Sequence, residues 1–352
     1  MQNRHEEVQK YYSETLQKSE DLKTNACCTM DAPPSYIKEV LEQIHPEVLA
    51  KYYGCGLTIP SELNNLKILD LGSGSGRDCF IAAKLVGEKG KVVGLDMTKY
   101  QVEVAKKYES YHQKAFGYHQ PNTHFIEGNI EELDQLDLQK SSFDLLISNC
   151  VINLAQNKEK VLKDAFQLLK EGGEMYFSDV YADRRISSEL QNDEVLWGEC
   201  LSGALYWNDF LQLAKKAGFT DPRAVEFSPI EINNPVLEKK VGNIKFYSVT
   251  YRLFKIQDLE NDCEDYGQAV CYKGSIINSK NQFLLDHHHF FEKGKIERVC
   301  GNTFKMLQET RFKKHFDFYG DFSTHFGIFE GCGVNMPFNE NLASAETSSS
   351  CC

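Results

Sequence analysis

Three glycines at alternate positions, Gly72, Gly74 and Gly76, follow a short apolar run that ends at Leu71. Glycine lets the backbone pass close to a ligand, and a helix that starts here would offer unpaired N–H groups. A dinucleotide-binding fingerprint would place its third glycine at position 77, where this chain has Arg77, and no phosphate-binding lysine follows. The spacing therefore favours a turn that binds S-adenosylmethionine (SAM) over one that binds NAD or ATP.

A carboxylate follows at the end of the next apolar run. Asp96 closes residues 91–96 and lies 20 residues after Gly76. At the tip of a second strand, an acidic side chain can accept both ribose hydroxyls of a nucleoside. The alternative is a solvated aspartate at a strand end, but the two motifs together favour nucleoside binding.

Cysteine is the other residue type that could do chemistry, with 12 in the chain. They form no C-x-x-C pair, so neither a zinc knuckle nor a thioredoxin-like motif is supported. The chain also shows no secretory signal, which argues against a disulfide scaffold. These cysteines are therefore either buried packing residues or reactive thiols.

Several cysteines fall where a parallel sheet binds its ligands, beyond the carboxyl ends of the strands. Cys150 directly follows residues 143–149, Cys200 lies between the fifth strand and the next helix, and Cys55 stands between two glycines in an open loop. Each alone is better explained as packing, since cysteine is often buried. Together they favour a shared thiol site for a soft, pyramidal, thiophilic centre. Zinc would want a fourth ligand, and no histidine lies near these motifs.

The elements that position these residues alternate between strand and helix. Expected strands are residues 67–71, 91–96, 123–127, 143–149 and 173–179, and expected helices are 77–87, 99–115, 130–136, 157–170 and 206–217. This alternation predicts an α/β fold with a parallel sheet covered on both faces. Residues 223–229 and 245–254 are expected to pair as an antiparallel hairpin at the sheet edge.

The two ends of the chain differ in texture from this region. Residues 1–60 are expected to form helices over 4–19 and from Ser35, the latter capped by Ser35, and a lid with a loop at 21–34. Residues 61–255 would be the main domain, and 256–332 a small α+β domain with strands at 268–272, 283–291 and 296–299, a hairpin turn at 292–295 and a helix at 303–311. Residues 333–352, which end in Cys351 and Cys352, are expected to be disordered.

Bulk properties limit the possible partners. The chain has 352 residues and a net charge of −12, which argues against tight binding to nucleic acid. It has no apolar run near the length of a membrane span, and its polar N-terminus has no signal-peptide core. We therefore expect a cytoplasmic protein, monomeric and without a membrane or nucleic-acid partner.

The motifs together resemble a known family. TNACC (24–28), KYYGCGL (51–57), ILDLGSGSGRD (68–78), VVGLDMT (92–98), QVEVA (101–105), SNCVINL (148–154), GGEMYFSDVY (172–181) and LWGECLSGALYW (196–207) are similar to the arsenic(III) SAM methyltransferases. The resemblance covers residues 5–255, and the small C-terminal domain resembles the family more loosely. It implies a Rossmann-like methyltransferase sheet of seven strands that ends in a hairpin.

The resemblance also implies roles for four cysteines. Cys150 and Cys200 would hold As(III) through the last methylation, and Cys55 would be the third thiolate and then a redox partner. Cys27 would be a relay or disulfide partner, although the adjacent Cys28 leaves open which of the two serves. A disulfide among Cys27 or Cys28, Cys55 and Cys79 would return arsenic to the trivalent state, with thioredoxin or glutathione as the reductant. For Cys79, packing is the favoured alternative.

The same resemblance places the cofactor. Its binding residues would be Tyr53, Asp70, Gly72, Ser73, Gly74, Arg77, Asp96, Met97, Ile130 and Glu131. The glycine turn and Arg77 would surround the methionine part, Met97 would pack on the adenine, and Ile130 and Glu131 would flank its edge. An alternative for Glu131 is an acid in a first helical turn that offsets the helix dipole.

The predicted reaction moves methyl groups from SAM to thiol-bound arsenite, or to its glutathione conjugate, and gives mono- and dimethylated arsenicals. It needs no resident metal and no general base, because alignment of the arsenic lone pair with the methyl group suffices. One rival is a SAM methyltransferase of this fold acting on a sterol or quinone. Another is a non-catalytic thiol protein that sequesters arsenic or antimony. A tail that captures arsenic through Cys351 and Cys352 remains open, and metal binding at residues 287–289 is disfavoured because in a strand only two of these histidines could share a ligand.

Overall fold

The computed structural model describes residues 33–51, 54–198 and 200–331. The predicted helix at 4–19, most of the predicted loop at 21–34 and the disorder predicted for 333–352 lie outside these residues. So do five of the singled-out side chains, those of Cys27, Cys28, Tyr53, Cys351 and Cys352. Among the described residues, no helix is long and apolar enough to cross a membrane.

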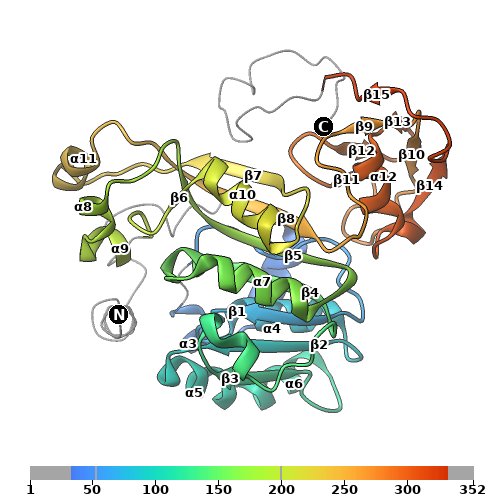
Figure 1. Ribbon diagram of the computed structural model, residues 1–352. Coiled ribbons are helices and arrows are strands. Elements are labelled where there is room, and N and C mark those ends of the chain that lie inside the picture. Colours follow the sequence, from blue (N-terminus) through green and yellow to red (C-terminus); the bar gives the residue numbers. More distant parts are fainter. Residues whose placement is uncertain (1–32, 52–53, 199, 332–352) are drawn as a thin grey trace.

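One twisted sheet forms the main body (Figure 1). Its strands are β1 (Lys67–Leu71), β2 (Lys91–Asp96), β3 (Thr123–Glu127), β4 (Phe143–Asn149), β5 (Leu169–Ala182), β6 (Leu205–Tyr206), β7 (Arg223–Pro229) and β8 (Phe246–Phe254). The order is β3-β2-β1-β4-β5-β8-β7, with β6 paired to β5. The first five strands in this order, from β3 to β5, run parallel, so their carboxyl ends meet at one edge. The predicted α/β sheet is confirmed, and four of its five strands have the predicted bounds.

Helices cover both faces of this sheet. One face carries η3 (Ile130–Gln135), η4 (Ile152–Leu154), α7 (Lys158–Leu168) and α10 (Trp207–Ala217). The other carries α2 (Ser35–Leu41), α3 (Pro46–Leu49), α4 (Arg77–Val86), α5 (Lys99–Lys107) and α6 (Glu109–Phe116). Each face has its own apolar core, and alternate β1 residues enter different ones: Ile68 joins the second and Leu69 the first. The period-two pattern of a strand therefore decides which helices it holds.

The helix predictions need three corrections. The stretch 99–115 is two helices, because the backbone leaves helical geometry at Tyr108. The helix at 130–136 is a 3-10 helix with a kink at Glu132. Ser35 is the first residue of α2 rather than its cap, since Pro34 occupies the cap position and no side chain caps the helix.

The predicted edge hairpin is confirmed, and β8 lies between β5 and β7, antiparallel to both. Three helices that the sequence pattern did not reveal follow β5 or join β7 to β8: α8 (Ser188–Gln191), α9 (Glu194–Gly198) and α11 (Pro235–Val241). Each is seven residues or shorter, too short for a periodic pattern to indicate it.

The C-terminal domain, residues 256–331 of the described chain, packs beside this sheet (orange to red in Figure 1). It contains β9 (Glu264–Asp265), β10 (Ala269–Tyr272), β11 (Gln282–Leu284), β12 (Phe290–Glu292), β13 (Ile296–Arg298), α12 (Gly301–Gln308), η5 (Lys313–His315), β14 (Phe316–Tyr319) and β15 (Gly327–Ile328). Its small sheets are β13-β10-β14, β11-β12 and β15-β9. The hairpin predicted across residues 292–295 is therefore wrong, because β12 pairs with β11 and β13 with β10. The predicted α+β character is confirmed.

The single strand predicted at 283–291 is wrong. The chain instead folds back as the hairpin β11-β12, and the three histidines lie in its turn. His289 is buried there and bonds through Nδ1 to both oxygens of Asp286 at 2.8 Å. The apolar residues on either side of the turn made one continuous pattern, which concealed it.

Candidate active site

The predicted glycine turn joins β1 to α4. Gly72, Gly74 and Gly76 all have positive φ, between 52° and 91°, a region that favours glycine. At Gly74 an added Cβ would meet nothing within 4 Å, so the space above this backbone is open to a ligand. The turn is held from below, because the N–H groups of Gly72 and Ser73 donate to the carbonyl oxygen of Leu95 at 2.7 and 2.9 Å.

Asp96 closes one side of this turn from the end of β2. Its carboxylate accepts hydrogen bonds from the backbone N–H of Gly74 at 2.9 Å and of Thr98 at 2.8 Å. A carboxylate has about four lone-pair positions, so each oxygen can still accept a ribose hydroxyl. The predicted ribose site therefore has a carboxylate that the glycine turn itself orients.

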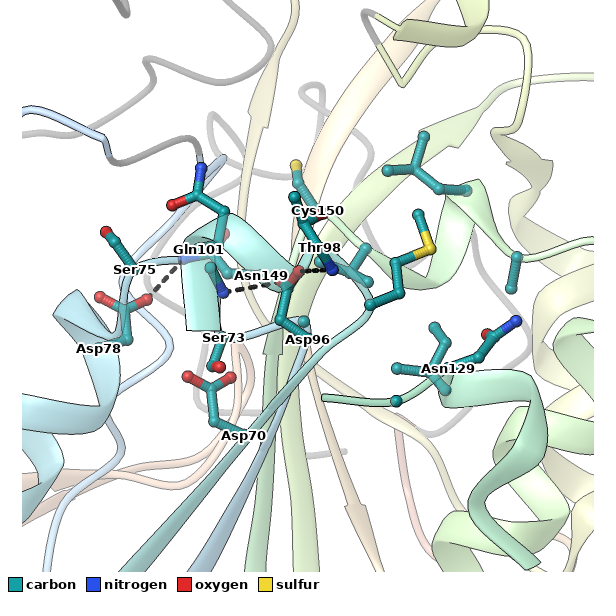
Figure 2. Close-up of a pocket in the computed structure, with 18 of the residues that line it drawn as sticks. Asp70, Ser73, Ser75, Asp78, Asp96, Thr98, Gln101, Asn129, Asn149 and Cys150 are labelled. Carbon is teal, nitrogen blue, oxygen red and sulfur yellow. Dashed lines mark hydrogen bonds between the residues drawn. The ribbon is translucent and has the colours of Figure 1, made fainter. Parts of the chain in front are cut away.

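A pocket opens over these residues, with an empty volume of about 1040 Å³ that includes solvent at its mouth. Figure 2 shows Asp70, Asp96, Asn149 and Cys150 around it. Of the ten residues predicted to bind the cofactor, nine line this pocket: Asp70, Gly72, Ser73, Gly74, Arg77, Asp96, Met97, Ile130 and Glu131. The tenth, Tyr53, lies outside the described residues.

Two of these pocket-lining residues already have partners in the protein. Arg77 forms an ion pair with Asp78 at 3.3 Å. Glu131 accepts hydrogen bonds from the backbone N–H groups of Gln156 and Asn157 at 2.9 and 2.8 Å. Its carboxylate thereby ties η3 to the segment after η4, whereas the alternative from the sequence was an effect on the helix dipole.

The pocket is also lined by Thr98, Gln101, Asn129 and Asn149, which no sequence pattern had indicated. Gln101 is the most informative, because its side chain is buried and its amide oxygen has no hydrogen-bond partner among the described residues. A buried polar atom of this kind calls for a ligand. Gln101 begins the quoted QVEVA motif, but only its position in the pocket lining indicates that it could bind a ligand. Together with the open space over Gly74, it makes the pocket fit for the nucleoside of the predicted cofactor.

Buried acid groups lie at the pocket floor. Burial raises the pKa of Asp70 well above its usual range, and repulsion from Asp78 adds to this. The Cys79 thiol donates to Asp70 at 3.2 Å from α4. Burial likewise raises the pKa of that thiol. Cys79 is therefore a packing residue, as the favoured interpretation had it, and a protonated thiol suits it poorly for redox exchange.

The predicted thiol site is assembled from three separate segments. Cys55, Cys150 and Cys200 are at most 4% exposed and lie in one buried cluster at the carboxyl edge of the sheet. The Cys200 thiol donates to the carbonyl oxygen of Cys150 at 3.6 Å. Both Cys150 and Cys200 have left-handed backbones, with φ of 55° and 61°, which are costly for residues other than glycine. Cys150 also lines the pocket, so the sulfur cluster and the cofactor pocket are contiguous.

The disulfide in the structure differs from the predicted pairing. It joins Cys55 to Cys150, with a Cα–Cα distance of 5.8 Å, whereas Cys55 was expected to pair with Cys27, Cys28 or Cys79. The sheet fold brings these two residues together across 95 positions of sequence, a proximity that the sequence pattern does not encode. Two of the three predicted arsenic ligands are therefore oxidised to each other in this state.

Asn149 links the sulfur cluster to the pocket. Its amide oxygen accepts from the Cys55 N–H at 2.9 Å, and its amide nitrogen donates to the Gly56 carbonyl at 2.9 Å and to Asp78 at 3.2 Å. From the other side, Ser248 donates to the Cys55 carbonyl at 2.6 Å, and the Ser178 hydroxyl lies 3.7 Å from the Cys55 sulfur. The loop that carries Cys55 is thus fixed by side chains of three strands.

Asn153 fixes the segment after Cys150 to β5, and the segment after Cys200 packs directly against it. Its backbone N–H donates to buried Asp179 at 2.9 Å and its amide nitrogen to the Val180 carbonyl at 2.5 Å. Burial raises the pKa of Asp179 to about 7. Gly203 packs so closely on Asn153 that an added Cβ would overlap its carbonyl oxygen.

Gly203→Ala should therefore separate the two cysteine segments. Since the obstacle is backbone, the chain must shift, and we expect a loss of about 1–3 kcal/mol in the free energy of unfolding. Misplacement of the sulfurs should lower the arsenite methylation that the resemblance predicts by about 10- to 100-fold, with SAM affinity unchanged. Denaturant unfolding, methylation assays and calorimetry measure these effects.

Gly301→Ala is the matched control, because its Cβ would meet only aromatic rings at 3.1 to 3.3 Å. Equal methylation rates in the two variants would contradict the conclusion that the contact between Gly203 and Asn153 positions the two cysteines.

No resident metal site is found in the part of the chain that the structure describes, where no three His, Cys, Asp or Glu side chains are grouped to hold an ion. This covers the histidine turn at 287–289, in which His289 bonds to Asp286 and Thr303 instead. A thiophilic centre of the kind that the resemblance predicts could bind all three cysteines of the cluster only after the disulfide is reduced.

Comparisons with known proteins agree with this geometry. Residues 62–218 match a family model described as a methyltransferase domain. Residues 266–352 match one described as the arsenite methyltransferase C-terminal domain. The chain is 56% identical over 348 residues to the arsenite methyltransferase of Aquipseudomonas alcaligenes, covering 99% of this chain and 100% of that protein. It is 47% identical over 317 residues to that of Rattus norvegicus, covering 89% and 85%.

A solved structure is similar as well. The arsenic(III) S-adenosylmethionine methyltransferase CrArsM from Chlamydomonas reinhardtii is 49% identical, with a TM-score of 0.83 over 85% of this chain and 100% of that one. This likeness confirms the predicted Rossmann-like methyltransferase fold.

Proposed function

Because the chain belongs to the arsenite methyltransferase family, we propose that it transfers methyl groups from SAM to trivalent arsenic held by Cys55, Cys150 and Cys200. The observation that carries the proposal is the position of Cys150, which belongs both to the sulfur cluster and to the lining of the pocket. Arsenic bound to this sulfur would lie next to the cofactor.

The sulfur cluster supplies what arsenic chemistry needs. Soft thiolates suit a thiophilic centre, and three of them match its pyramidal geometry. The buried surroundings exclude water, so oxygen ligands do not return to the arsenic once the thiolates have displaced them. The same cage fixes the direction of the arsenic lone pair, which is the nucleophile in the transfer.

Bound in the pocket, SAM supplies an electrophilic methyl group on a positively charged sulfonium. Asp96 and the glycine turn orient its ribose and Gln101 offers an amide oxygen. Asp70 offers a carboxylate for a cationic part of the cofactor. None of these residues acts as a general base, since the nucleophile is a lone pair and carries no proton.

The reduced pair of Cys55 and Cys150, which the disulfide joins when oxidised, gives the protein a source of electrons. Methyl transfer takes arsenic formally from the trivalent to the pentavalent state. Oxidation of the Cys55 and Cys150 thiolates to a disulfide releases two electrons, which return arsenic to the trivalent state. Glutathione or thioredoxin then reduces the disulfide and is itself oxidised. Cys27 or Cys28 would pass the disulfide outward, and mono- and dimethylated arsenicals would leave a monomeric enzyme.

The two rival functions make different demands on the cluster. A sterol or quinone methyltransferase needs an apolar pocket, and cysteine-to-serine changes would spare its activity. A sequestering protein needs the thiols but no cofactor, whereas this chain keeps a complete glycine turn and an oriented Asp96.

The direct test incubates the protein with arsenite, SAM and glutathione and identifies the products by mass. Methylated arsenicals with matching formation of S-adenosylhomocysteine are expected. Tight arsenite binding without consumption of SAM would favour sequestration instead.

The buried acids predict a proton linkage. Burial raises the pKa of Asp70, so this acid holds its proton to a higher pH in the empty pocket than a solvated aspartate does, and a cationic cofactor should favour release of that proton. SAM binding should therefore release protons and tighten as pH rises between the bound and unbound pKa values. Calorimetry in buffers of different ionisation enthalpy measures this. S-adenosylhomocysteine, which lacks the sulfonium charge, should release fewer protons. Equal heats in all buffers would contradict the role of Asp70.

A further inference from the structure

The C-terminal domain reaches the segment that carries Cys55. Arg311 donates to the Ser61 carbonyl at 3.3 and 3.2 Å through two of its nitrogens. Glu62 forms an ion pair with Lys314 at 2.6 Å, and Nε2 of His315 lies 3.3 Å from its carboxylate. Residues 61–62 are thereby bound to η5 and to the turn before it by three side chains of the C-terminal domain.

The backbone of Glu62 shows that these contacts impose a conformation. Its φ is 59°, a left-handed value that is costly for a residue with a side chain. Such a conformation persists only when the surroundings hold it, and the Glu62 side chain is only 11% exposed between Lys314 and His315.

The other end of the same segment enters the active site. Thr58 donates to Asp78, which lines the cofactor pocket, at 3.3 Å. Cys55 is held by Asn149 and Ser248. Residues 55–62 therefore stretch between the sulfur cluster and the C-terminal domain, with anchors at both ends.

From these contacts we infer that the C-terminal domain positions Cys55 for exchange with Cys150. Lys314 and His315 act as positioning residues through Glu62, and touch neither arsenic nor the cofactor. When the disulfide opens, the clamp on residues 61–62 limits how far the Cys55 loop can withdraw. It thereby keeps the effective concentration of the two thiols high. The inference deepens the proposed function, because it concerns the redox pair of that same site.

The test measures the disulfide equilibrium without arsenite or SAM. The full chain is equilibrated in buffers of reduced and oxidised glutathione, in which two glutathione thiols reduce the disulfide and become glutathione disulfide. After alkylation, mass analysis of the peptides gives the fraction in which Cys55 is joined to Cys150. Glu62→Gln and Lys314→Met should each lower the equilibrium constant for this disulfide by about tenfold. Lys313→Met is the matched control, a change of the neighbouring lysine in η5, and should leave the constant unchanged.

A merely structural role would lower the melting temperature and leave the disulfide equilibrium as in the wild type. That result, or equal constants in all variants, would overturn the inference. Lys314 is largely exposed, so its variant keeps the test decisive if Glu62→Gln fails to fold. The assay needs no methyl transfer, so its failure is distinct from failure of the proposed function, which the wild-type methylation assay reports.

Discussion

Cys200→Ser and Cys150→Ser should each lower the rate of arsenite methylation by about 100-fold or more. Serine offers a hard, protonated hydroxyl where a soft centre needs a thiolate. Each change thereby removes one arm of the cage that aims the arsenic lone pair. Both residues are nearly inaccessible to solvent, so no outside thiol can readily replace the lost sulfur.

The measurement is the initial rate of methylarsenical formation with SAM and glutathione in excess. Cys271→Ser is the matched control, since this cysteine lies on β10 of the C-terminal domain. SAM affinity should survive in the Cys200 variant, because Cys200 lies outside the pocket lining. Methylation at the control rate in both cluster variants would remove the basis for a thiol-held substrate.

Arg252→Met should lower the free energy of unfolding by about 3–5 kcal/mol, because it leaves a buried charge short of a partner. Glu174 on β5 is 0% exposed and pairs with Arg252 at 3.0 Å and with Arg311 at 2.6 Å. Arg252 also donates to the Leu285 carbonyl at 2.6 Å. The triad thus joins the central sheet to the C-terminal domain.

The pH dependence of this loss identifies its origin. Burial raises the pKa of Glu174, but the charges of Arg252 and Arg311 outweigh it and hold the pKa below its usual range. A lowered pKa stabilises the fold above the unfolded pKa, and this contribution disappears as pH falls through the folded pKa. Denaturant unfolding should therefore show a large difference from the wild type at neutral pH and a smaller one in acid.

Glu174→Gln combined with Arg252→Met should be no more stable than Arg252→Met at neutral pH, since Glu174→Gln also removes the carboxylate partner of the largely buried Arg311. A single Arg252→Met variant as stable as the wild type would show that the triad does not hold the domains together.

The sequence predicted the main sheet well because its signals are local. The apolar runs that end in Leu71 and Asp96 each define a strand, and the glycines that follow Leu71 indicate a tight turn. The signals failed where structure depends on distant contacts. The apolar residues of 283–291 conceal a hairpin whose turn is set by Asp286 and His289. Similarly, the quoted motif around Asn149 gave no sign that its amide would hold the Cys55 loop from 94 residues away.

The sulfur site shows the same division. Placement of Cys150 and Cys200 at the carboxyl edge followed from the order of strands, and the cluster brings both together with Cys55. The partner of Cys55 did not follow, because pairing depends on how the loop at 54–60 folds back over β4 and β5. Chain order can place a residue at an edge of the sheet, but it cannot choose among sulfurs that arrive there.

The central claim is that three sulfurs hold arsenic beside the cofactor pocket, and arsenic X-ray absorption of the reduced protein with one equivalent of arsenite tests it most directly. The spectrum of the wild type should show three sulfur neighbours around arsenic, and that of Cys200→Ser should show two. A wild-type spectrum dominated by oxygen neighbours, or one that Cys200→Ser leaves unchanged, would contradict the claim.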